Sequence, residues 1–142
     1  MTSYELLDIG IAAGNRLDVQ WGLFVTVHLA ILGGIAYVDR PLRPLEKVGA
    51  MAVYVSFIIV NYRATRFHMG LLQHAYREVA DMAVDSCCIN SKTVAFVARD
   101  VASGRFDFAN TFATVAHLLM AALVVLAIIF NVELSSRLKE QE

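Results

Sequence analysis

The fold is decided by residues 19–38, which read VQWGLFVTVHLAILGGIAYV. This stretch, bracketed by Asp18 and Asp39, contains no Asp, Glu, Lys or Arg. The hydrocarbon core of a bilayer is about 30 Å thick, and about 20 helical residues cross it at a rise of about 1.5 Å each. The stretch is therefore predicted to be a transmembrane helix, and Trp21 and Tyr37 lie near its ends as interfacial aromatic residues do.

Two further runs lack these charged residues, a shorter one at 48–62 and a longer one at 108–132. The longer run can span a bilayer by its length. The shorter run spans if the long side chains of Lys47, Arg63 and Arg66 reach back to the interface and the helix continues beyond it.

We therefore expect an all-α, multi-pass integral membrane protein with three transmembrane helices, at about 19–38, 45–63 and 108–132. The composition agrees, because 58% of the chain is hydrophobic whereas a typical soluble domain is about 45–50% apolar. The lipid bilayer is the first expected partner, and a plasma or inner membrane is the expected location. A formal net charge of −1 without a dominant basic face argues against a nucleic-acid partner.

Both prolines of the chain, Pro41 and Pro44, lie in residues 39–47. Proline cannot continue a helix interior, and it pushes the residue before it toward extended geometry. This segment is therefore predicted to be a tight connector between the first two transmembrane helices, which would then be antiparallel.

The second helix is predicted to extend as a long amphipathic helix to about residue 85, because its helical period continues and no further proline follows. Its apolar stripe, which we expect to face protein, recurs at steps of four and three residues: Phe67, Leu71, Ala75, Val79 and Met82. A shorter helix at about 91–103 is expected to begin at Ser91 and to stop at Gly104.

These elements predict a single membrane domain, 1–142, that includes a helical extramembrane hairpin at about 64–107. Residues 3–16 mix apolar and charged side chains, as a short interfacial helix ahead of the first span would. Glycines at positions 10 and 14 weaken that helix.

Two histidines lie inside the predicted spans, His28 in the first and His117 in the third. Each is nine residues past the start of its run, so both are expected at a depth of about 13–14 Å from the same face. Three interpretations stay open. The imidazoles can make hydrogen bonds across a helix interface, line a pathway for ions or small solutes, or ligate a metal or the iron of haem b.

Small residues at a four-residue spacing allow helices to approach closely. The first span carries such a pair in Ala30 and Gly34, and the third carries Ala113 and Ala121 on the same helical period. The spacing does not separate contacts within one chain from contacts between chains.

The sequence contains no nucleophile–base arrangement, phosphate loop or HExxH motif, and its adjacent cysteines, Cys87 and Cys88, cannot form a disulfide framework. We therefore expect a small non-enzymatic membrane protein without a cofactor, which self-associates and encloses a pathway. One alternative is a haem- or metal-binding electron-transfer subunit that uses His28 and His117. Another is a structural subunit whose partners are other membrane subunits.

Overall fold

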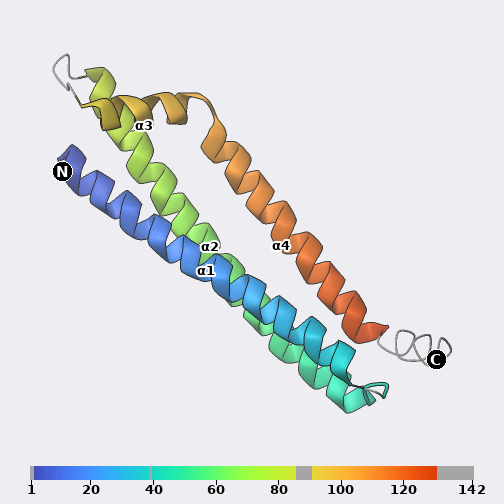
Figure 1. Cartoon of the computed structure of the whole chain (residues 1–142). Helices are drawn as coiled ribbons and strands as arrows, with labels where there is room; N and C mark the ends of the chain where they lie inside the picture. Colours follow the sequence, from blue (N-terminus) through green and yellow to red (C-terminus); the bar gives the residue numbers. More distant parts are fainter. Residues whose placement is uncertain (1, 39, 86–90, 131–142) are drawn as a thin grey trace. The chain divides into compact units, whose positions relative to one another are not determined.

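The computed structural model describes residues 2–38, 40–85 and 91–130, without the side chains of 83–85 and 106. This part of the chain consists of helices without strands, in the order α1 (Ser3–Tyr37), α2 (Pro44–Asp85), α3 (Lys92–Ala102) and α4 (Arg105–Ile129) (Figure 1). The prediction of an all-α protein is thus confirmed. By length and composition α1, α2 and α4 could each cross a membrane.

Helix α1 is longer than predicted, because the interfacial helix expected at 3–16 and the first span form one helix of 35 residues. The separate interfacial helix was therefore a wrong prediction. The helix begins at a capping box, in which the Glu5 N–H donates to the Thr2 hydroxyl and the Thr2 N–H donates to the Glu5 carboxylate. Gly10 lies inside α1, where its missing side chain leaves room for the ring of Tyr76. A Cβ atom at this position would collide with that ring.

Helix α2 has 42 residues, close to the predicted 45–85. Pro44 occupies its first position, where a missing N–H costs little. The Glu46 carboxylate accepts a hydrogen bond from the Arg43 N–H at 2.8 Å and two from the Arg40 guanidinium at 2.7 and 2.8 Å. The hydrogen bonds to Glu46 raise the pKa of Arg40.

Helix α3 begins and ends as predicted. The hydroxyl of Ser91 accepts a hydrogen bond from the Val94 N–H, and Gly104 follows the helix with a φ of 72°. The cysteine pair at 87 and 88 lies outside the described residues.

The chain divides into two compact units, the first of which combines Met1–Trp21 with Ala64–Thr114. The predicted hairpin at 64–107 is therefore joined by the first half of α1. A buried cluster drawn from α1, α2 and α3 forms the core of this unit: Leu6, Val79, Val94 and Val97. Ion pairs link Arg77 to Asp107 and Arg105 to Asp100, each at 2.8 Å.

The predicted apolar stripe of α2 is only partly buried. Ala75 and Val79 are buried, whereas Phe67 is 65% exposed and Leu71 is 38% exposed, so the prediction that these two face protein was wrong within this chain. In a helix with 3.6 residues per turn, a residue four positions further along lies about 40° around the helix axis from the first. After three such steps, Phe67 lies about 120° around the helix from Val79.

The second unit combines Gly22–Arg63 with Val115–Glu142, of which the structure describes the residues up to 130. Its buried apolar cluster consists of Tyr54, Val124 and Ile128, packed on α1 residues such as Ile31 and Ile35. At the end of α4 the Lys47 ammonium donates a hydrogen bond to the carbonyl oxygen of Ile129 at 2.7 Å. A cation at this position satisfies a carbonyl that the helix leaves without an intrahelical partner.

Candidate functional site

His28 lies on α1 and is completely buried, at 0% exposure. Its Nδ1 atom is 2.6 Å from the carbonyl oxygen of Phe24, one turn earlier, and its Nε2 atom is 2.8 Å from the hydroxyl oxygen of Tyr54 on α2. A carbonyl oxygen can only accept, so we assign the ring proton to Nδ1. Nε2 of the neutral ring then accepts from the Tyr54 O–H, and both ring nitrogens of His28 are engaged by the chain.

His117 lies on α4 and is also buried, at 2% exposure. Its Nε2 atom is 3.1 Å from Oδ1 of Asn61 on α2. As placed, the ring donates this hydrogen bond, and a flip of the amide that exchanges its oxygen and nitrogen would let Asn61 donate instead. The pair therefore accommodates either tautomer of the imidazole. The ring of Tyr62 packs edge-on against His117, with the ring centroids 5.7 Å apart.

The structure brings the two predicted histidines together through a third ring. The centroid of Phe24 lies 4.0 Å from that of His28 and 4.2 Å from that of His117. We call the resulting group the buried histidine cluster: Phe24, His28, Tyr54, Asn61 and His117. It lies within the second unit and receives side chains from α1, α2 and α4.

The buried histidine cluster has the chemistry of a helix–helix interface that is closed to solvent. A ligand to haem iron or another metal must offer a free lone pair, and both nitrogens of His28 already make hydrogen bonds. The Phe24 ring packs against both imidazoles, so the rings as arranged do not fit a pair of axial haem ligands. The described residues also contain no group of three or more His, Cys, Asp or Glu side chains that could hold a metal ion.

A pathway through the chain is not favoured by this arrangement either. A conducting path needs polar groups that face water, whereas His28, His117 and Asn61 have at most 2% of their surface exposed. Hydrogen bonds between helices in a membrane stabilise a fold by about 0.6 kcal/mol on average. The arrangement therefore favours the interpretation of the histidines as packing residues.

Phe24 and Tyr54 were not identified from the sequence. A signal for Tyr54 was present, because a tyrosine hydroxyl within an apolar run requires a hydrogen-bond partner when it is buried. Tyr54 and Asn61 are seven residues apart, about two helical turns, so they share one face of α2. This spacing indicated that α2 presents two hydrogen-bonding side chains to the helices beside it.

The four predicted helix-packing residues have different surroundings. Ala113 is buried and Ala121 is partly buried, whereas Ala30 and Gly34 are exposed. A Cβ atom added at Gly34 would meet no neighbouring atom within 4 Å. In this chain α1 therefore presents Ala30 and Gly34 outward, whereas α4 presents Ala113 inward.

Comparisons with protein-family models, curated proteins and solved structures find no match. The function of the chain is therefore argued from its own contacts.

Proposed function

We propose that the chain is a small multi-pass integral membrane protein without enzymatic activity, which acts as a structural subunit and self-associates through α1. In this proposal α1, α2 and α4 cross the bilayer, and the buried histidine cluster fixes their packing. The partners of the chain are lipid and further copies of itself.

The distribution of polar and apolar side chains supports placement in a membrane. The second unit buries two histidines and an asparagine while it exposes large apolar side chains on all three of its helices: Leu23, Val25, Leu29, Val53, Ile59, Val60, Leu118, Leu119 and Leu123. Exposure of this much apolar surface to water would be costly, at about 25 cal/mol for each Å². Lipid is the solvent in which such a surface is stable.

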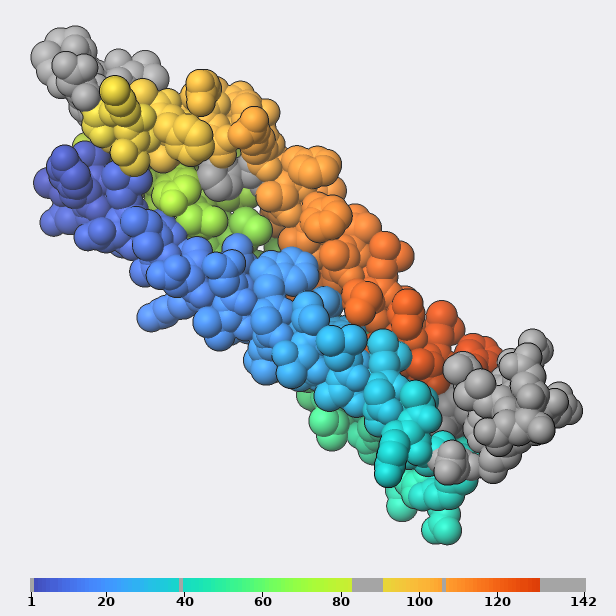
Figure 2. All heavy atoms as spheres, in the orientation of Figure 1, coloured from blue at the N-terminus to red at the C-terminus, as the bar shows by residue number. Residues whose placement is uncertain are grey.

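The observation that carries the proposal of self-association is the outer face of α1. Gly22, Thr26, Ala30 and Gly33 are all exposed, and at about 100° per residue they lie within an arc of about 80°. His28 lies on the opposite side of the helix. We call these four residues the small-residue face. In the space-filling view no other helix covers the near side of α1 (Figure 2).

The chemistry of the small-residue face suits a close approach by another helix. A Cβ atom added at Gly22 or Gly33 would meet nothing within 4 Å, so the space beside the backbone is open. The hydroxyl of Thr26 donates to the Gly22 carbonyl at 2.8 Å, so no unsatisfied donor faces the partner. Small residues at this spacing are a common interface between transmembrane helices, because they let the two backbones pack directly.

The proposal is tested by substitution on this face. Ala30→Leu and Gly33→Leu should weaken association, measured by energy transfer between labelled chains in lipid bilayers as the protein-to-lipid ratio is varied. Ala122→Leu is the matched control, because Ala122 is an exposed alanine on α4, away from the small-residue face. A chain that is monomeric at every ratio would refute the proposal, and so would equal effects of Ala30→Leu and Ala122→Leu.

A further inference from the structure

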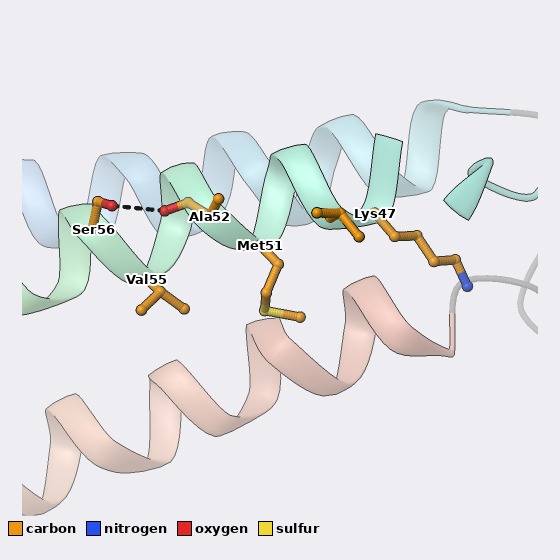
Figure 3. Close-up of a pocket in the computed structure, with 6 residues that line it drawn as sticks. Lys47, Met51, Ala52, Val55 and Ser56 are labelled. Atoms are coloured by element: carbon orange, nitrogen blue, oxygen red, sulfur yellow. Dashed lines mark hydrogen bonds between the residues drawn. The ribbon is translucent and has the colours of Figure 1, made fainter. Parts of the chain in front are cut away.

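A shallow, open groove of about 600 Å³ lies along one side of α2 in the second unit, and its described lining residues all belong to this helix. It is lined by Lys47, Val48, Met51, Ala52, Val55 and Ser56. Figure 3 shows that Met51 and Val55 point from α2 toward α4, with Lys47 at one end of the row. The volume falls within the range of about 300–1,000 Å³ that is usual for sites that bind small molecules.

The described side chains that line the groove are apolar except for Ser56 and Lys47, and Lys47, the charged one among them, lies at one end. The hydroxyl of Ser56 donates to the Ala52 carbonyl of its own helix at 2.8 Å, so it does not require a ligand. The Lys47 ammonium is held in place by its hydrogen bond to the Ile129 carbonyl. An ammonium has three donors, so further donors are available to a bound group.

The length of the groove matches one leaflet of a bilayer. Lys47 and Ser56 are nine residues apart, which corresponds to about 13.5 Å along a helix. Half of a hydrocarbon core is about 15 Å. A ligand that fits therefore has an extended apolar chain about one leaflet long, and a negatively charged group at the level of Lys47.

We propose that this groove binds one acyl chain of an anionic phospholipid, whose phosphate is bound by Lys47. Charge complementarity favours this occupant. Among the described residues that line the groove none is acidic, and the nearby Glu46 carboxylate is paired with Arg40 at 2.7 Å. Arg43, one turn before Lys47, is exposed and adds a second positive charge at this level.

The inference rests on the placement of α2 across a bilayer, and it is independent of self-association through α1. The two ideas fail separately, because lipid retention and association can be measured on the same variants. Loss of association with lipid binding intact would leave the groove as proposed.

The experiment uses the full chain in nanodiscs of phosphatidylcholine that contain a minority of phosphatidylglycerol. Retained lipid is identified by native mass spectrometry after release of the protein. We expect phosphatidylglycerol to be retained in preference to phosphatidylcholine. Lys47→Gln should weaken this retention about fivefold, the effect of one basic residue at an anionic membrane surface, whereas Lys47→Arg should preserve it.

A second variant tests the apolar part of the groove while the charge remains. Ala52→Phe fills the groove and should displace the lipid with Lys47 intact. The matched controls are Ala122→Phe, another exposed alanine, and Lys92→Gln, an exposed lysine on α3, neither of which should change retention. Circular dichroism and gel filtration establish that each variant is folded.

Three results would overturn the proposal. The first is equal retention of phosphatidylglycerol and phosphatidylcholine by the unmodified chain. The second is competition by soluble glycerol phosphate as effective as that by the intact lipid, since the acyl chain would then contribute nothing. The third is a change of oligomeric state in Ala52→Phe with unchanged lipid retention, since a second copy of the chain would then occupy the groove.

Discussion

Removal of the Tyr54 hydroxyl tests the buried histidine cluster most directly. Tyr54→Phe keeps the ring and deletes the O–H that donates to Nε2 of His28 at 2.8 Å. His28 is fully buried, so no water replaces the lost donor. An interhelical hydrogen bond in a membrane contributes about 0.6 kcal/mol on average, and a buried acceptor left without a partner costs about 1–3 kcal/mol.

We therefore expect Tyr54→Phe to lower the free energy of unfolding by about 1–2 kcal/mol. The measurement is reversible unfolding in mixed micelles, monitored by circular dichroism. Tyr62→Phe is the matched control, because it deletes the same atom from a half-buried tyrosine whose ring only borders His117. The control should change stability by less than about 0.5 kcal/mol.

A double-mutant cycle identifies the partner. In a His28→Leu background the Tyr54 hydroxyl has lost its acceptor, so its removal should become neutral or stabilising. The sign of the Tyr54→Phe effect thus depends on His28. Additive effects of the two substitutions would refute the reasoning, as would a cost for Tyr62→Phe equal to that for Tyr54→Phe.

Two further predictions concern the first unit. Gly10→Ala should destabilise the chain by about 1–3 kcal/mol because the added methyl collides with the Tyr76 ring, whereas Gly14→Ala should stabilise it by about 0.5–1 kcal/mol because nothing lies within 4 Å of the added methyl. Thermal unfolding of the two variants measures this contrast, and equal effects would contradict the contact between Gly10 and Tyr76. Ser91→Ala removes the acceptor of the Val94 N–H and should cost about 1 kcal/mol, visible as faster amide hydrogen exchange in α3, while unchanged exchange there would show that the cap contributes nothing.

The sequence was sufficient to predict the helices because their signals are local. The absence of charged side chains from 19–38 and the position of Pro41 and Pro44 at the start of α2 depend on no other part of the chain. The cap at Ser91 and the stop at Gly104 are similarly local, and α3 begins and ends close to them. The boundary at residue 16 was misjudged because the apolar and charged residues at 3–16 have the composition of an interfacial helix. Gly10 does not end the helix there, because its missing side chain leaves room for the ring of Tyr76.

The contacts within the buried histidine cluster depend on how the helices are rotated and packed, which the spacing of residues in the sequence does not give. The two histidines were identified because an ionisable ring is conspicuous in an apolar run, and their similar depth followed from counting residues. Tyr54 and Phe24 were missed because their roles depend on how the helices are rotated about their axes. The same rotation placed Phe67 on the surface, where the four-residue pattern predicted a protein contact.

The hydrogen bond between Tyr54 and His28 has a consequence for how the α1–α2 hairpin selects one alignment. Aliphatic side chains pack almost equally well after one helix slides along the other, so apolar contacts discriminate weakly between sliding positions. A slip of one turn would move His28 by about 5.4 Å, beyond hydrogen-bond reach of Tyr54, and would leave two dipoles unpaired in hydrocarbon. The hydrogen bond between Tyr54 and His28 thus fixes the position of α1 along α2, which the apolar contacts between the two helices do not determine by themselves.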